Sequence, residues 1–167
     1  QTALSASKGE IFMKMLLVGA GAVGESILRI LKARDCSGEW LKGVVIADYD
    51  LDRAKEVAAH LGNGSRYVPV QVDAHNRQDL VDLIRKHKCD FVMDAAAPFV
   101  SNNIFDAAYE AGAHYGNMGT WSVPMDNPKL GLGIENSYLE PMTKYNFDRH
   151  EAWSKKGILA CICLGID

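Results

Sequence analysis

A glycine-rich segment near the N-terminus has the residue types and spacing of a turn that binds phosphate groups. Its glycines are Gly19, Gly21 and Gly24, and the residues between them are Ala20, Ala22 and Val23. In such a turn the first glycine allows a sharp change of direction, the second lets a pyrophosphate lie against bare backbone, and the third lets a helix pack close to a strand. The amides at the N-terminus of that helix face the phosphates. The spacing predicts a site for the pyrophosphate of a dinucleotide.

The residues on both sides of the glycines predict a strand, a turn and a helix in that order. Residues 15–18 form an apolar run that is typical of a buried strand. Residues 22–34 follow the helical period and place Val23, Ile27 and Ile30, together with Leu31, on one stripe that is expected to pack on a sheet. Because this context distinguishes the motif from a chance match, a tight turn without a ligand is the less favoured interpretation.

A carboxylate stands at the end of the second predicted strand, residues 44–47. Asp48 follows the third glycine at close to the ~20-residue spacing of an acid that accepts hydrogen bonds from the adenosine ribose. Arg53, in the next predicted helix, is either a solvated surface charge or a ligand for the 2'-phosphate of NADP. The surface interpretation is favoured, since Asp48 repels such a phosphate. The expected cofactor is therefore NAD or NADP, with NAD slightly favoured.

Two further strand ends carry residues suited to the same ligand. Residues 67–72 alternate around Pro69, which favours a strand at the edge of the sheet, and Asp73 and Ala74 follow where an adenine ring lies in this architecture. Residues 91–93 predict a fourth strand. The small residues after it either let a dinucleotide pass close to the backbone or connect to a helix that starts at a proline, and the two interpretations have equal weight. These residues are Ala95, Ala96, Ala97, Pro98 and Phe99.

The remaining segments continue the alternation of strands and helices. Asp50 and Asn76 are expected to cap the helices that follow them, and Gly112 is expected to end a helix that begins near residue 102. A short fifth strand is predicted at 114–117. Residues 118–137 have no period and contain Trp121, so we expect either a functional or a disordered loop there.

The pattern as a whole predicts an α/β fold. One amphipathic helix is expected at 138–156, followed by a sixth strand at 158–164. Six strands that alternate with helices indicate a Rossmann-type doubly wound parallel sheet with strand order 3-2-1-4-5-6. Residues 1–12 are interpreted as a flexible leader, and 13–167 as one dinucleotide-binding domain.

Composition excludes several other classes of function. The 167 residues carry a net charge of -3, which gives no electrostatic reason to expect nucleic acid or an anionic membrane as a partner. No apolar run approaches the ~20 residues of a membrane span, and the expected location is the cytoplasm. Cys161 and Cys163 alternate on the predicted sixth strand, so packing is favoured over metal binding, and no metal site is predicted.

The histidines were considered as acid or base candidates. None of them stands near a carboxylate or a cysteine in a way that singles out a catalytic or metal site. No catalytic residue is therefore predicted. The histidines are His60, His75, His87, His114 and His150.

The ordered set of these motifs resembles the N-terminal dinucleotide-binding domain of the saccharopine dehydrogenase family. That family includes saccharopine reductases, lysine 6-dehydrogenase-like proteins and carboxynorspermidine dehydrogenases. The resemblance is carried by VGAGAVG (18–24), IADYDLDRA (46–54), VDA (72–74), AAAPF (95–99), AGAHY (111–115) and GID (165–167). In relatives the last motif is typically followed by Pro-Gly and a substrate and dimerisation domain. The resemblance implies that this chain is a fragment without that domain, and that the fragment alone is inactive.

The resemblance also implies roles for individual residues. Gly19, Gly21 and Gly24 are assigned to the pyrophosphate, and Asp48 with its neighbours Tyr49 and Asp50 to the adenosine ribose. On the same basis Asp73 and Ala74 lie on the adenine side, and residues 95–99 at the middle and the nicotinamide end. Two departures put the substrate in doubt. The fifth strand ends in Gly116 and Asn117 where the family often has an acid, and the 118–137 loop is longer than in lysine dehydrogenase-like members.

The function implied by the resemblance is oxidoreductase chemistry. A hydride passes between the nicotinamide and the carbon of a CH–NH group in an amino-acid or polyamine derivative, and the parent protein is a homodimer. A regulatory module that binds a dinucleotide without turnover is the alternative from another class. A methyltransferase with a similar glycine turn fits less well, because Gly24 opens a helix at dinucleotide spacing.

Overall fold

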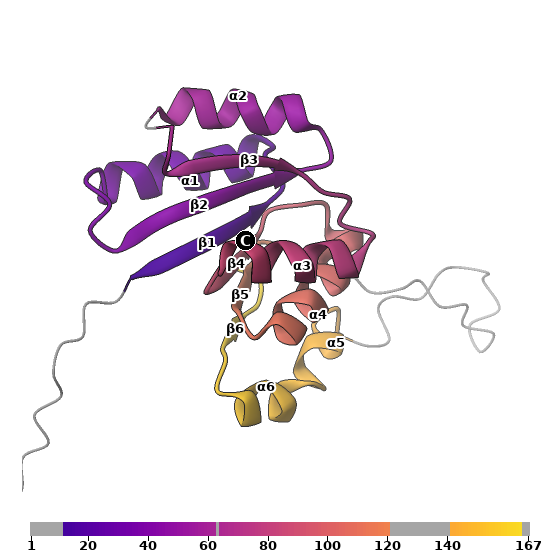
Figure 1. Cartoon of the computed structure of the whole chain (residues 1–167). Helices are drawn as coiled ribbons and strands as arrows, with labels where there is room; N and C mark the ends of the chain where they lie inside the picture. Colours follow the sequence, from indigo (N-terminus) through magenta and orange to yellow (C-terminus); the bar gives the residue numbers. More distant parts are fainter. Residues whose placement is uncertain (1–11, 63, 121–140, 165–167) are drawn as a thin grey trace, which may run out of the picture.

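A six-stranded parallel sheet with helices on both faces organises the part of the chain that the computed structural model describes, residues 12–62, 64–120 and 141–164 (Figure 1). The strands are β1 (Met13–Val18), β2 (Leu41–Asp48), β3 (Tyr67–Gln71), β4 (Phe91–Asp94), β5 (His114–Asn117) and β6 (Ala160–Cys161). The helices are α1 (Ala22–Arg34), α2 (Leu51–Leu61), α3 (Arg77–His87), the 3-10 helix η1 (Pro98–Val100), α4 (Ser101–Ala111), α5 (Lys144–Phe147) and α6 (His150–Lys156).

The strand order confirms the predicted topology. It is β3-β2-β1-β4-β5-β6, and each neighbouring pair is parallel. β3 lies at the edge, as Pro69 predicts, because a residue without an N–H is tolerated where a second partner strand is absent. The chain leaves β1 toward β2 on one side and returns to β4 on the other. The carboxyl end of β1 is therefore the point at which the order reverses.

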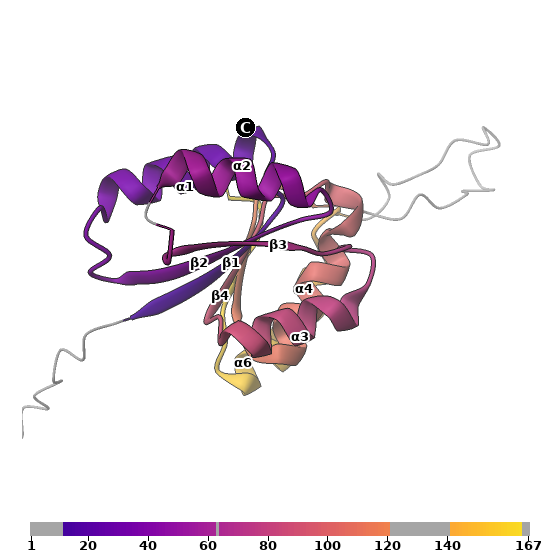
Figure 2. The ribbon, with the colours of Figure 1, turned by 45° about the horizontal axis from the view of Figure 1, so that its top comes forward.

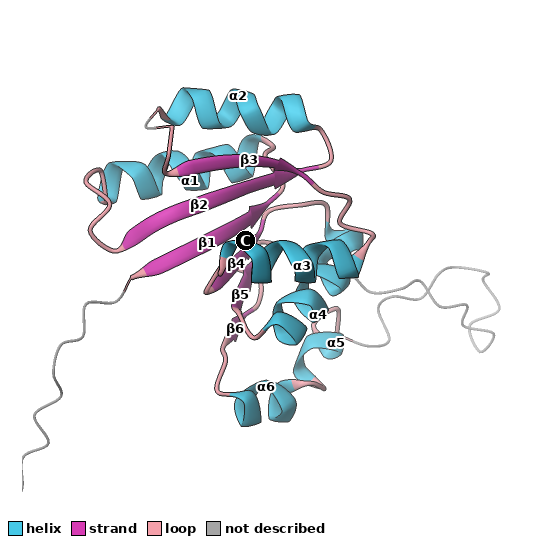
Figure 3. Ribbon diagram, viewed as in Figure 1, coloured by secondary structure: helices cyan, strands magenta, loops and turns pink. Residues whose placement is uncertain are grey.

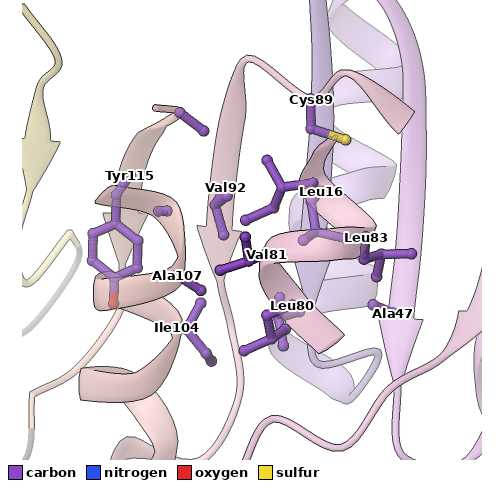
Figure 4. Packing of buried hydrophobic residues seen from close by; sticks show 14 of the residues in the cluster. Leu16, Ala47, Leu80, Val81, Leu83, Cys89, Val92, Ile104, Ala107 and Tyr115 are labelled. Atoms are coloured by element: carbon purple, nitrogen blue, oxygen red, sulfur yellow. The ribbon is translucent and has the colours of Figure 1, made fainter. Parts of the chain in front are cut away.

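The helices form one layer on each face of the sheet. In Figure 2, α1 and α2 lie on one side of the strands, and α3, α4 and α6 lie on the other. Successive side chains of β1 alternate between these layers, so Met15 and Leu17 pack in one core and Leu16 and Val18 in the other. Figure 4 shows the core that contains Leu16, which lies beside Val92 of β4 and side chains of α3 such as Leu83. Burial on both faces explains the unbroken apolar run at residues 15–18.

Two helix starts confirm the predicted caps. The carboxylate of Asp50 accepts hydrogen bonds from the amides of Asp52 at 2.9 Å and Arg53 at 3.2 Å. The side-chain oxygen of Asn76 accepts from the amides of Gln78 at 3.1 Å and Asp79 at 3.4 Å. Each cap satisfies amides that have no partner within their own helix.

The buried stripe of α1 agrees only in part with the prediction, because Leu31 packs against the core but Val23 and Ile30 do not. Gly24 and Leu28 are the buried residues, whereas Val23 is 49% exposed and Ile30 is 53% exposed. The helix approaches the sheet most closely at Gly24, so its line of contact runs along the i, i+4 row through Leu28. This row turns the side chains of Val23 and Ile30 away from the sheet.

The C-terminal segment also differs from the prediction. Within its described part, two short helices, α5 and α6, replace the continuous helix expected at 138–156 (Figure 3). The break has a local cause. The guanidinium of Arg149 donates to the carbonyl of Tyr145 at 2.7 Å, and the amide of Arg149 bonds to Asn146 in the tighter 3-10 pattern.

The sixth strand is shorter than the predicted 158–164 and comprises only Ala160–Cys161. Cys163 has a φ of 62°, a left-handed conformation that ends the extended chain. Instead of pairing along β5, the amide of Cys163 bonds to the side chain of Asn117 at 2.8 Å. Cys163 therefore does not alternate with Cys161 on one strand.

Several predictions fall on segments outside the described residues. These are the leader apart from Phe12, the larger part of the 118–137 loop with Trp121, and the closing GID motif. Within the described ranges, no helix combines the length and apolar character needed to cross a bilayer.

Candidate functional site

A crevice of about 900 Å³ opens at the carboxyl ends of β1, β2, β3 and β4. This is the point where the strand order reverses, and ligands of open α/β sheets bind there. Most of the residues that the sequence assigns to a cofactor line it. They are Gly19, Gly21, Asp48, Tyr49, Asp73, Ala74, Ala95, Ala96, Ala97 and Phe99.

The other assigned residues lie next to the crevice without lining it. Ala20 is fully buried behind the turn, and Gly24 is buried between α1 and β1. Ala22 and Val23 are exposed in the first turn of α1, Asp50 caps α2, and Pro98 begins η1. The helix start at Pro98 is therefore confirmed, whereas the passage of a dinucleotide along the alanines and Phe99, which line the crevice, stays a prediction.

The first and third glycines fit their predicted steric roles. Gly19 has a φ of +97°, and a Cβ there would lie 2.6 Å from the carbonyl oxygen of Ala95. A Cβ at Gly24 would lie 2.0 Å from the carbonyl oxygen of Gly19. The turn thus packs against the loop after β4 on one side and against α1 on the other. Neither position has room for a side chain.

The second glycine is different, because the space around it is open. A Cβ built on Gly21 meets no atom within 4 Å, and its φ of -67° is accessible to any residue. Gly21 is also the N-cap of α1 and provides no side-chain cap, which leaves the first amides of the helix available to a ligand. The protein itself does not require a glycine here, whereas close approach of a phosphate to the backbone does.

Asp48 holds the turn and faces the crevice. One carboxylate oxygen accepts from the amide of Ala20 at 2.6 Å, and the other accepts from the amide of Asp50 at 3.0 Å. A carboxylate offers about four lone-pair positions, so Asp48 can still accept hydrogen bonds from the two ribose hydroxyls. The side chain therefore connects the phosphate turn to the position where the sugar is expected.

Arg53 is part of a charged cluster and differs from the solvated charge that the sequence favoured. Its Nε donates to the carbonyl of Ala20 at 2.8 Å, and its two terminal nitrogens donate to Glu25 at 2.6 Å and Glu56 at 2.7 Å. Glu25 also accepts from Arg29 at 2.6 Å and lies 3.1 Å from His60. The cluster joins the first turn of α1 to α2 directly behind the glycine turn.

The cluster makes the stability of the fold depend on pH. Hydrogen bonds from Arg29, Arg53 and His60 lower the pKa of Glu25 from 4.5 to about 2. The pKa of Glu25 is lower in the folded chain than in the unfolded chain. Its ion pairs therefore stabilise the fold fully above pH 4.5, and this stabilisation is lost as the pH falls toward about 2. We expect Glu25→Gln to lower the free energy of unfolding at neutral pH, and the deficit to shrink across this window. Urea unfolding of both proteins at a series of pH values measures it.

Glu151→Gln provides the matched control for that comparison. Glu151 also pairs with a lysine one turn away on its helix, but its side chain is 78% exposed. Removing the charge of Glu151 is expected to change the free energy of unfolding little at any pH. A Glu25→Gln deficit that stays constant from neutral pH down to about 2 contradicts the assigned pKa.

The crevice also includes a pair of stacked rings, His75 and Phe99, that the sequence did not bring together. The rings of His75 and Phe99 stack at a centroid distance of 5.9 Å and an angle of 26°. Nδ1 of His75 lies 2.9 Å from the carboxylate of Asp73, and His60 lies beside Glu25, so two histidines do pair with carboxylates. The backbone amide and the ring of His75 lower the pKa of Asp73. In the sequence, the signal for this contact was the position of His75 directly after Asp73 and Ala74 at the end of β3.

A buried polar network around Asp94 supports the loop after β4, which lines the crevice. The hydroxyl of Tyr115 donates to Asp94 at 2.8 Å, and the amide of Ala96 donates to the other oxygen of Asp94 at 3.0 Å. The side chain of Ser101 also hydrogen-bonds to Asp94. Burial raises the pKa of Asp94 in spite of these bonds. One carboxyl group thus ties the loop after β4 to β5 and to the start of α4.

Removing one donor from this network should destabilise the domain. In Tyr115→Phe, Asp94 stays buried and loses the hydroxyl at 2.8 Å, so we expect a loss of about 1–3 kcal/mol in the free energy of unfolding. Urea unfolding measures the loss. Tyr49→Phe is the control, since Tyr49 is 79% exposed and its change should be close to zero. Equal unfolding midpoints for Tyr115→Phe and the unchanged chain contradict the role of this hydrogen bond.

The chemistry of the crevice is that of binding and orientation. Within the described part of the chain, no group of histidine, cysteine and acidic side chains is arranged to hold a metal ion. Backbone amides, carboxylates and small residues line a cleft whose volume lies within the ~300–1,000 Å³ of small-molecule sites. These groups suit an elongated ligand with phosphates near α1 and a sugar near Asp48.

Comparisons with known proteins agree with this geometry. The chain is 27% identical over 112 residues to carboxyaminopropylagmatine dehydrogenase from Synechocystis, in a match that covers 66% of this chain and 27% of the relative. Saccharopine dehydrogenase (L-Glu forming) from Saccharomyces cerevisiae shares the fold with a TM-score of 0.60 at 19% identity, over 93% of this chain and 28% of that one. The chain thus spans about a quarter of each protein.

A further solved structure and a family model extend these matches. GenD2 from gentamicin A biosynthesis, solved in complex with NAD, matches with a TM-score of 0.60 at 15% identity, over 97% of this chain and 37% of that one. The model of the saccharopine dehydrogenase NADP binding domain matches residues 15–161, which is most of the chain. The chain therefore belongs to the saccharopine dehydrogenase family and is an NAD(P)-binding domain of this family of oxidoreductases.

Proposed function

We propose that the crevice binds NAD(H) for an enzyme that transfers a hydride to or from the CH–NH group of an amino-acid or polyamine derivative. The observation that supports it most is Gly21, which has open space around it, stands at an uncapped helix N-terminus and lies in the same crevice as Asp48. Bound nicotinamide supplies the hydride acceptor or donor. The residues of this chain bind and orient it.

The preference for NAD over NADP is argued from two side chains. The carboxylate of Asp48 lines the crevice at the end of β2, and it repels a phosphate placed on the ribose. Arg53, the nearby cation that could receive that phosphate, is already bonded to Ala20, Glu25 and Glu56. We therefore expect NADH to bind at least about tenfold more tightly than NADPH, a difference of ~1.4 kcal/mol.

The substrate class is inferred from the named relatives. The two dehydrogenases matched here act, by their names, on carboxyaminopropylagmatine and saccharopine. In the proposed reaction the C–H bond of the CH–NH group breaks, its electron pair goes with the hydrogen to the nicotinamide, and the nitrogen loses a proton, which leaves an imine. The reverse reaction reduces the imine. We propose that the residues that bind the substrate and the homodimer interface lie in the remainder of a cytoplasmic parent protein.

Binding and turnover together test this function. The 167-residue chain is titrated with NADH and with NADPH, and the parent protein is assayed with NAD and a panel of secondary amines derived from amino acids and polyamines. Tight NADH binding with turnover of such an amine supports the enzyme. Tight binding without turnover across the panel supports a dinucleotide sensor. If neither dinucleotide binds, the proposed function is wrong.

A further inference from the structure

We propose that Glu25 contributes to the cofactor preference of this site by holding Arg53 away from the ribose position. The inference rests on the proposed function, since it concerns which dinucleotide the crevice prefers. Glu25 is not among the residues that line the crevice and acts through Arg53. It is therefore a positioning residue.

Arg53 lies close to the expected ribose position. Both polar backbone atoms of Ala20 are bound, its amide by the carboxylate of Asp48 at 2.6 Å and its carbonyl by Nε of Arg53 at 2.8 Å. The carboxylate and the guanidinium thus lie on either side of one residue. Because an arginine side chain is long and flexible, a rotation brings its planar fork to a phosphate placed beside Asp48.

The hydrogen bonds of Arg53 oppose such a rotation. Each of its three guanidinium nitrogens donates to an acceptor, namely Glu25, Glu56 and the carbonyl of Ala20. A phosphate on the ribose can recruit Arg53 only if at least one charged partner releases it. The energetic cost of that release is subtracted from the affinity for NADPH and leaves the affinity for NADH unchanged.

Of the two acidic partners, Glu25 is the better held. Its side chain is 14% exposed, and its second oxygen is fixed by Arg29 at 2.6 Å and lies 3.1 Å from His60. Glu56 is 53% exposed and belongs to the same helix as Arg53, where screening and side-chain freedom weaken an ion pair. The structure therefore predicts unequal effects when the two acids are neutralised.

The test compares NADH and NADPH affinities of the 167-residue chain at neutral pH, by titration calorimetry, for Glu25→Gln and for Glu56→Gln. The readout is the ratio of the two dissociation constants, because an effect on the pyrophosphate, which both dinucleotides carry, cancels in that ratio. We expect Glu25→Gln to shift the ratio toward NADPH by about tenfold. Glu56→Gln should shift it by less than about twofold.

A double variant tests whether the shift depends on Arg53, and Glu56→Gln, which changes the net charge by the same amount as Glu25→Gln, tests the effect of charge alone. In Glu25→Gln/Arg53→Met the shift toward NADPH is expected to disappear, because Arg53, the cation proposed to receive the phosphate, is absent. A shift that persists in the double variant, or an unchanged ratio in Glu25→Gln, overturns the inference while NADH binding still supports the proposed function. If the unchanged chain binds neither dinucleotide, both are wrong.

A second variant keeps the inference testable if Glu25→Gln does not fold. Glu25→Asp keeps the charge but withdraws the carboxylate by one methylene, so the 2.6 Å contact with Arg53 is broken. Its ratio should shift in the same direction as that of Glu25→Gln. If Glu25→Gln does not fold and Glu25→Asp folds with the unchanged ratio, the inference is likewise overturned.

Discussion

Gly24→Ala is expected to destabilise the domain by about 3 kcal/mol or more, because the new methyl group collides with the backbone. Its Cβ would lie 2.0 Å from the carbonyl oxygen of Gly19 and 3.2 Å from the side chain of Leu17. The oxygen belongs to the glycine turn itself, so relief requires α1 to move away from β1. Urea unfolding of the variant and the unchanged chain measures the loss.

The control is a glycine in the adjacent layer of the fold, the sheet. At Gly43, in β2, a Cβ has its nearest contacts at 3.8 Å and 3.9 Å, which are ordinary van der Waals distances. Gly43→Ala should therefore unfold close to the unchanged chain. If Gly24→Ala unfolds at the same urea concentration as Gly43→Ala, then α1 does not pack on the turn as closely as the structure shows.

Gly21→Val is expected to keep the fold and to weaken NADH binding by about 100-fold, or ~2.7 kcal/mol. A side chain at this position meets no protein atom within 4 Å of its Cβ, and φ -67°, ψ -170° is extended backbone. The same side chain occupies the space in front of the α1 amides, where the pyrophosphate is proposed to lie. Unfolding experiments and an NADH titration of the variant separate the two effects.

The pair of glycine variants therefore tests two different roles in one motif. Gly24 is required by the protein and Gly21 by the ligand, so stability should fall in the first variant and affinity in the second. Gly21→Ala, with a smaller side chain, should lie between the valine variant and the unchanged chain in affinity. Unaltered NADH affinity in Gly21→Val means that the phosphates do not approach this backbone.

Local patterns in the sequence were enough to predict the sheet and most of the crevice. Asp50 and Asn76 cap their helices because capping involves residues only two or three positions apart. Pro69 identified the edge strand through the missing N–H. Asp48 could be placed from its spacing to Gly24, because one helix, a short connection and one strand separate the two residues.

Contacts between distant elements were beyond reach of the sequence. The carboxylate of Asp35 bonds to the guanidinium of Arg66 at 3.0 Å and closes the connection from α1 to β2, although the two residues are far apart in the chain. The bonds of Arg53 to Ala20 and Glu25 likewise join two separate helices. Such pairs depend on how the helices are placed over the sheet, which periodicity does not encode.

The break between α5 and α6 was missed for a related reason. The apolar residues of 138–156 have helical spacing, but Arg149 uses its side chain to bind the Tyr145 carbonyl that a continuous helix reserves for a backbone amide. β6 is short because Cys163 adopts a positive φ and bonds to Asn117. Neither the side-chain bond of Arg149 nor the positive φ of Cys163 can be predicted from residue type.

The central claim, that the glycine turn and Asp48 bind a dinucleotide, is tested most directly by residue-resolved NMR of the 167-residue chain during titration with NADH. We predict that the backbone amides from Gly19 to Glu25 and those next to Asp48 shift together and saturate at one dissociation constant. Shifts confined to the smaller cavity of about 350 Å³ beside α6, which includes Trp153 and Phe147, contradict the claim, as does an unchanged spectrum.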